Sequence, residues 1–182
     1  ETLLQLISDD ENEAVDMAQK VLYKYSDLYY ENWLHNMKCK LGIFDEEAMD
    51  KAIIEDLLSM MEKYKEDFTN TFVSLTYRKN MDRGMFLTAE FTNWYKNWQE
   101  RLERQEKSLD KAYELMKNSN PVVIPRNHKV EEALKAADNG DFTVMEKLLS
   151  VLSNPYEYRE DIDEYRELPQ PTDLPYRTYC GT

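Results

Sequence analysis

The sequence predicts an all-α protein, an irregular multi-helix bundle that ends in an extended, proline-rich tail. The chain has 182 residues but only four glycines and six prolines, so long stretches contain no helix breaker. Apolar residues recur at steps of three and four along most of the chain, and no stretch alternates with the period of a strand. We therefore divide the chain into a helical region, residues 1–153, and a tail, residues 154–182.

The first seven residues already show the pattern of an amphipathic helix, with no initiator methionine and no basic, apolar leader. We expect a chain cut from a longer one, and a processed terminus is the alternative. In a cut chain some of the apolar residues here should have lost their partners and be exposed: Leu3, Leu4, Leu6 and Ile7.

The longest predicted helix covers residues 10–40. Asp9 or Asp10 offers an N-cap, and Gly42 follows as a C-terminal stop. One apolar face runs along it at helical spacing: Val15, Ala18, Leu22, Tyr25, Tyr29, Trp33 and Met37.

Two shorter helices follow before a loop at residues 79–87. The first begins near Asp45 or Asp50 and buries a set of isoleucines, leucines and methionines. The second is capped by Asp67 or Thr69.

The helical pattern restarts at Thr88 with a broad stripe: Phe91, Trp94, Tyr95, Trp98 and Leu102. Residues 99–107 interleave glutamate and arginine at helical spacing, which we interpret as a solvated face. The pattern continues or restarts at Leu109. It ends before Pro121, because a residue that precedes proline is pushed out of the helical region.

The last pair of helices should form an αα-hairpin around Asn139-Gly140. Asn127 suits the N-cap of its first helix, and Thr143 with Glu146 has the spacing of a capping box for the second. Residues 160–166 fit one solvated turn. The prolines of residues 166–182 exclude regular helix, so that segment should run extended.

Composition limits the classes of function. A hydrophobic content of 42% supports a real core, so the chain is not intrinsically disordered. The net charge of −13 argues against a nucleic-acid surface or an anionic membrane surface, since both need a basic face. No run approaches 18 consecutive apolar residues, which argues against a membrane span. Two cysteines make no disulfide framework and suit a reducing compartment.

We expect this segment to contain no catalytic, cofactor-binding or metal-binding residues. No two glycines lie close enough to form a phosphate-cradling loop. His35 and Cys39 are four residues apart on one helix and could reach one ion, but two ligands do not complete a tetrahedral shell. Single cysteines such as Cys39 usually pack as small hydrophobes.

Two features of the sequence, the Arg126 loop and Cys180, could still have a functional role. Arg126, Asn127 and His128 follow a proline, and the guanidinium is suited to a carboxylate or a phosphate. This loop is either pinned by a buried arginine ion pair or in contact with another domain. Cys180 lies on the predicted tail, where residue chemistry alone leaves a passive thiol and a redox thiol equally open.

Residues 120–134 contain an Asn-Pro, an Arg-Asn-His and a Glu-Ala element, and these resemble the C-terminal signature of the selenoprotein O family, also called the YdiU or UPF0061 family. Gly-Asp-Phe at residues 140–142, Asn-Pro-Tyr at 154–156 and Tyr-Arg-Thr-Tyr-Cys-Gly-Thr at 176–182 follow at the spacing of that family. Residues 37–42 and 67–72 also match. The resemblance covers nearly the whole chain.

This resemblance implies a pseudokinase-like enzyme that transfers AMP from ATP to Ser, Thr or Tyr of target proteins in the cytoplasm of a bacterium. The family's ATP and Mg²⁺ residues lie in an N-terminal part that precedes this sequence. The segment would then be a structural or regulatory C-terminal part of a kinase-like lobe, inactive alone, with the N-terminal kinase-like domain of the same chain as its partner.

The resemblance also gives Cys180 a role. It occupies the position where many eukaryotic members have selenocysteine, and in the family this residue is proposed to pair with a cysteine of the kinase-like part as a redox control. Position 177 is arginine here, so the tail lacks the second cysteine of some members.

Two other classes of function are kept. The chain could be an acidic helical protein-interaction module with no enzymatic parent, or a metal-binding bundle that rests on His35 and Cys39. The sequence upstream in the gene separates the first of these from the enzyme, which needs a glycine-rich loop, a lysine strand and an Asp/Asn metal pair there.

Overall fold

The computed structural model describes residues 6, 8 and 10–170, and these divide into two compact units, Glu1–Asn120 and Pro121–Thr182. Within the described residues every regular element is helical, which confirms the all-α class. A boundary between the helical region and the tail at residues 153/154 stays a prediction, because residues 171–182 of that tail lie outside the described residues.

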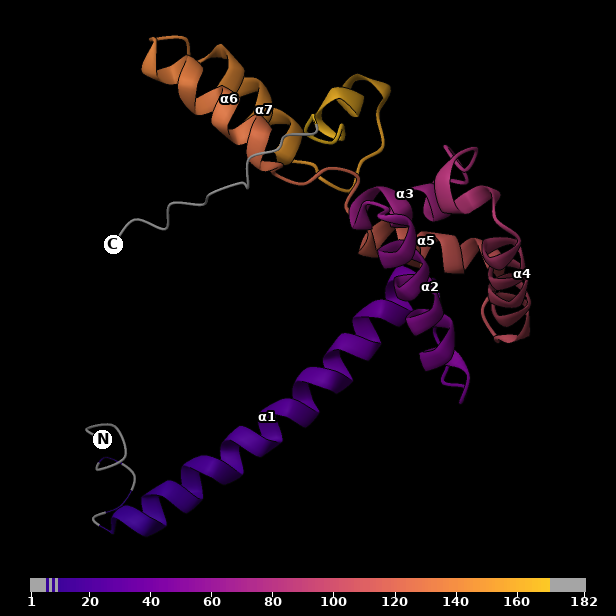
Figure 1. Ribbon diagram of the computed structural model, residues 1–182, viewed down its shortest axis with the longest axis vertical. Helices are drawn as coiled ribbons and strands as arrows, with labels where there is room; N and C mark the ends of the chain where they lie inside the picture. The colour runs from indigo at the N-terminus through magenta and orange to yellow at the C-terminus, as the bar shows by residue number, and fades with distance from the viewer. Residues whose placement is uncertain (1–5, 7, 9, 171–182) are drawn as a thin grey trace. The chain divides into compact units, whose positions relative to one another are not determined.

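The elements described for residues 10–120 of the first unit are α1 (Glu11–Lys40), α2 (Asp50–Tyr64), α3 (Phe68–Tyr77), the 3-10 helix η2 (Gly84–Leu87), α4 (Ala89–Arg104) and α5 (Leu109–Ser119). Figure 1 shows that α2–α5 gather around the C-terminal end of α1, while the rest of α1 extends away from them.

Two of the expected caps are confirmed, and the helix that restarts at Thr88 is capped by that residue. Asp10 accepts hydrogen bonds from the backbone N–H groups of the first turn of α1. Asp67 accepts from the Asn70 N–H at 2.8 Å, and Thr88 accepts from the Phe91 N–H at 3.1 Å. Each cap satisfies a helix donor that has no partner within its own helix, which fixes where α1, α3 and α4 begin.

The core of the first unit is aromatic and aliphatic. Trp94 and Trp98 of α4 stack with ring centroids 5.5 Å apart. Their indole N–H groups donate to the carbonyls of Ile53 and Leu41, at 2.8 and 2.9 Å, so the burial of both rings leaves no donor unpaired. These bonds attach α4 to α2 and to the end of α1.

The charged segment at residues 99–107 is a solvated face only in part. Glu100, Glu103, Arg104, Glu106 and Lys107 are exposed as predicted, whereas Arg101 and Gln105 are buried. Arg101 has an exposed fraction of 0%, and its Nε and Nη2 atoms donate to the two carboxylate oxygens of Asp50 at 2.6 and 3.2 Å. Gln105 is also buried, and its side-chain amide bonds to the Gly42 carbonyl and the Phe44 N–H. The alternating charges of this segment concealed that one side of the end of α4 packs against the connection between α1 and α2, because that side is also polar in sequence.

The second unit contains α6 (Asn127–Asp138), α7 (Thr143–Leu152) and the 3-10 helix η3 (Glu160–Tyr165). The first two helices form the expected hairpin (Figure 1). Val122 and Val123 are buried, and the Val122 N–H donates to the Pro155 carbonyl at 2.6 Å.

Three local expectations in this unit are wrong. Arg126, not Asn127, holds the N-cap position of α6, and no side chain caps that helix. The capping box at Thr143 does not form, because Asp141 accepts from both the N–H and the hydroxyl of Thr143. Residues 160–166 are not a solvated turn, since Ile162 is buried.

Gly42→Ala should lower the free energy of unfolding of this chain by about 2 kcal/mol. Gly42 has φ +74°, and an added Cβ would lie 2.8 Å from the Ala112 carbonyl oxygen of α5. Urea unfolding followed by circular dichroism measures the loss. Gly140→Ala is the control, because Gly140 also has a positive φ but no atom within 4 Å of the added carbon. Equal losses in the two variants would argue against a role for the close approach.

Arg101→Met should lower the free energy of unfolding by about 3–5 kcal/mol, because it leaves the buried Asp50 carboxylate without its arginine. Urea unfolding read by tryptophan fluorescence reports on this unit alone, since all three tryptophans lie in it. The double variant Asp50→Leu/Arg101→Met should be more stable than Arg101→Met.

Arg104→Met is the matched control for Arg101→Met. Arg104 pairs with Glu47 at 2.8 Å on the surface, where solvent screens the interaction. This control should lose little stability. A loss as large as that of Arg101→Met would contradict the role given to the buried pair.

Candidate functional site

Part of the apolar face of α1 is left exposed by the described core. At the C-terminal end of α1 this face is covered: Met37 is buried, and Trp33 and Leu34 pack against the core. Residues 19–32 are exposed all round. We name as the α1 stripe the exposed apolar residues that continue this face toward the N-terminus: Val21, Leu22, Tyr25, Leu28 and Tyr29.

The opposite side of α1 carries the charged residues of this segment, and Tyr23 lies among them with an exposed fraction of 73%. Asp16, Lys20, Lys24, Asp27 and Glu31 recur at steps of three and four, out of phase with the stripe. A helix with one apolar and one charged face is the type that packs on a protein surface, whereas a helix solvated all round is expected to be polar all round.

A groove of about 360 Å³ opens where the α1 stripe reaches the core. It is lined by α1, by Leu58 of α2 and by Phe68 at the start of α3. The α1 residues are spaced so that they share one side of the helix: Tyr29, Asn32, Trp33, Asn36, Met37 and Lys40. Tyr29 belongs to both the stripe and the groove, so the two surfaces are continuous.

Lys40 does not make the groove a site for an anion. Its ammonium donates to the Ser119 carbonyl at 3.0 Å and to Asn120 Oδ1 at 3.4 Å, and it lies 5.5 Å from the centroid of the Phe72 ring. Burial lowers the pKa of Lys40. The groove therefore offers apolar walls and two asparagine side chains, with its cation engaged inside the unit.

His35 and Cys39 come together as their spacing predicts, with Sγ and Nε2 3.7 Å apart. His35 is exposed and Cys39 is partly buried, and burial raises the pKa of the Cys39 thiol against the opposing charge of Lys38. Among the residues that the structure describes, no group of three or more His, Cys, Asp or Glu side chains could hold a metal ion.

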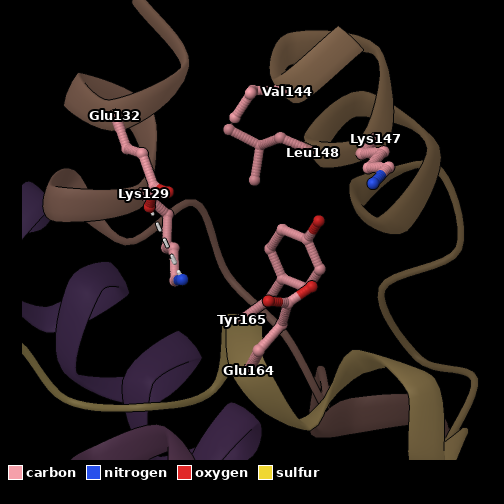
Figure 2. Close-up of a pocket in the computed structure, with 7 residues that line it drawn as sticks. All are labelled: Lys129, Glu132, Val144, Lys147, Leu148, Glu164 and Tyr165. Atoms are coloured by element: carbon pink, nitrogen blue, oxygen red, sulfur yellow. Dashed lines mark ion pairs between the residues drawn. The ribbon is translucent and has the colours of Figure 1, made fainter. Parts of the chain in front are cut away.

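A second, smaller pocket lies in the other unit between the hairpin and η3 (Figure 2). It has a volume of about 150 Å³ and is lined by Lys129, Glu132, Val144, Lys147, Leu148, Glu164 and Tyr165. Lys129 pairs with Glu132 at 3.6 Å, and burial raises the pKa of Tyr165. Two lysines and two glutamates balance each other, so the pocket selects neither an anion nor a cation.

The residues singled out in the sequence lie apart from both surfaces. Arg126 and His128 are half-buried and Asn127 is exposed, all at the start of α6. Both interpretations of this loop, a buried arginine ion pair and a contact with another domain, stay predictions. Cys180 and three of the four N-terminal apolar residues lie outside the described residues, while Leu6 is 81% exposed.

Sequence reasoning found the residues of the apolar face but not the groove. The groove needs Leu58 and Phe68 from other helices, and only the packing of α2 and α3 on α1 brings them there. In the part of the chain that is described, no helix is both long enough and apolar enough to cross a membrane.

Comparison with known proteins gives a consistent result. Residues 2–153 match the family model described as "Protein adenylyltransferase SelO". The chain is 55% identical over its whole length to a protein of Bacillus thuringiensis subsp. konkukian named "Protein nucleotidyltransferase YdiU", and it covers 38% of that relative. A protein of the same name from Clostridium beijerinckii is 54% identical, and the chain covers 37% of it.

The chain thus spans less than two-fifths of the length of the curated relatives that it matches. The match is nevertheless continuous across both units, and it takes in the stripe, the groove and the Arg126 loop. The chain belongs to the SelO family of protein adenylyltransferases, the family that its sequence resembles.

Proposed function

We propose that this chain is the helical C-terminal region of an enzyme that transfers AMP from ATP to hydroxyl groups of Ser, Thr or Tyr in target proteins. The observation that carries the proposal is 55% identity, over the entire chain, to a protein nucleotidyltransferase of which the chain covers 38%. In the transfer, the protein hydroxyl oxygen forms a bond to the α-phosphorus of ATP, and the bond to pyrophosphate breaks.

In this proposal the ATP and Mg²⁺ sites lie in the part of the enzyme outside this chain, and this region has a structural or regulatory role. The backbone supports that division. Gly42, Gly84 and Gly140 each stand alone in separate turns, so no described turn has the run of glycines that lets backbone N–H groups surround a phosphate.

The partner of this region is then the kinase-like part of the same polypeptide. The loop Arg126–Asn127–His128 is a contact to it, and the target proteins are partners of the whole enzyme. The relatives named above are bacterial, and a cytoplasmic enzyme with ATP as its substrate fits them. An independent acidic interaction module is the other candidate, but it leaves the whole-chain similarity to nucleotidyltransferases without a reason.

The tail supplies the regulatory element of the proposal. Cys180 forms a disulfide with a cysteine of the kinase-like part when an oxidant takes up two electrons, and reduction of the bond restores the two thiols. Within this chain the other cysteine, Cys39, is partly buried in α1, and burial raises the pKa of its thiol, which lowers the fraction present as thiolate.

This chain alone should bind no ATP in the presence of Mg²⁺, whereas the full-length enzyme should bind it. Isothermal titration calorimetry of both proteins, at the same nucleotide and metal concentrations, makes the comparison. Micromolar binding by the isolated chain would contradict the proposed location of the nucleotide site.

Cys180→Ser in the full-length enzyme should leave the melting temperature unchanged and remove the dependence of AMP transfer on oxidant and reductant. Transfer of labelled AMP to protein, measured after diamide and after dithiothreitol, reports this dependence. Cys39→Ser is the matched control and should keep it. A Cys180→Ser enzyme that still responds as the parent does would rule out this regulation.

A further inference from the structure

The α1 stripe has the chemistry of an interface and no cover within the described residues. Its side chains are exposed by 56–67%, and they include two tyrosines and two leucines. Contiguous apolar patches on a soluble protein surface usually mark sites of protein contact, in contrast to single exposed hydrophobic residues. The charged residues on the opposite side of α1 show which side is suited to solvent.

The groove lies at one end of this stripe and can receive a side chain of a docked element. Its volume of about 360 Å³ is at the small end for ligand sites, and its walls are mostly aromatic and aliphatic. Tyr29 joins it to the stripe, and Leu58 and Phe68 close the far wall. An element that lies along α1 can therefore place a bulky apolar side chain in the groove as an anchor.

Three candidates could cover this surface: the rest of the same polypeptide, a second copy of the chain, or a separate protein. More than three-fifths of the B. thuringiensis relative lies outside the matched region, so a large folded part of the same polypeptide is available at high effective concentration. Two copies of this chain would bring together net charges of −13 each, and that repulsion opposes self-association.

We propose that the α1 stripe and the groove form the docking surface for the part of the same polypeptide that lies outside this chain. The inference rests on the proposed function in one respect, that the chain is a region of a longer enzyme. The docked element presents apolar side chains to Val21, Leu22, Tyr25 and Leu28, and its anchor enters the groove beside Tyr29. The charged side of α1 remains in water.

Site-resolved cysteine labelling in the full-length enzyme tests this surface. Leu22→Cys and Tyr25→Cys place a thiol on the α1 stripe, and Lys20→Cys and Lys24→Cys place one on the charged side of the same helix as matched controls. All four positions are exposed in this chain. Alkylation by iodoacetamide is followed at each peptide by mass spectrometry, and each rate is divided by the rate in urea.

The stripe cysteines should react at least about tenfold more slowly than the controls, at every protein concentration. The docked element must first dissociate from α1 before iodoacetamide can reach these thiols. Equal rates on the two sides of α1 would overturn the proposal. Protection that is lost on dilution would also overturn it, since it would identify a second copy as the cover.

AMP transfer by the parent enzyme, assayed separately, keeps the two proposals distinct. A full-length protein with a protected stripe but without AMP transfer would support the docking surface and refute the proposed activity. A protein that transfers AMP but labels equally on both sides of α1 would keep the activity and refute the docking surface.

Discussion

The ion pair between Arg101 and Asp50 organises the first unit. It joins the last turn of α4 to the first turn of α2, and the same arginine donates to the Asp45 carbonyl in the connection between α1 and α2. Lys38 lies 3.7 Å from the Asp50 carboxylate and brings the end of α1 to the same point. A buried guanidinium is stable only while its acceptors are held in place, so the Asp50 carboxylate, with Arg101 and Lys38 as its partners, connects three helix ends.

A second polar cluster joins the ends of α1, α3 and α5. The Asn120 amide donates to the Lys40 carbonyl at 2.8 Å and to the Thr76 hydroxyl at 3.0 Å, while Lys40 donates back to the end of α5. The C-terminal ends of α1, α3 and α5 meet there and have carbonyls without helical partners. Both clusters lie at the C-terminal end of α1, which explains why the core of this unit does not extend along the rest of that helix.

The sequence was most informative where one residue acts on its own backbone. The caps at Asp10, Asp67 and Thr88 and the stop at Gly42 follow from local chemistry, and so do the types of the helices. Two of the misses were local, since Asn127 and Thr143 do not cap their helices as expected, whereas the larger ones involve partners far away in sequence. Arg101 reads as solvated because its neighbours are charged, and only its pairing with Asp50, 51 residues away, makes it a core residue. The groove was missed for the same reason, since α2 and α3 complete it.

The α1 stripe shows a different limit of sequence reasoning, because periodicity reports that a face is suited to burial and not what buries it. The face was read correctly from Leu22, Tyr25 and Tyr29, yet the core of this chain covers it only from Trp33 onward. The side chains of a helix face pack against whatever element lies opposite, so the element that buries an apolar face need not belong to the same unit. The amphipathic pattern continues past the last described helix that packs on α1, which is why we propose a cover from the part of the polypeptide outside this chain.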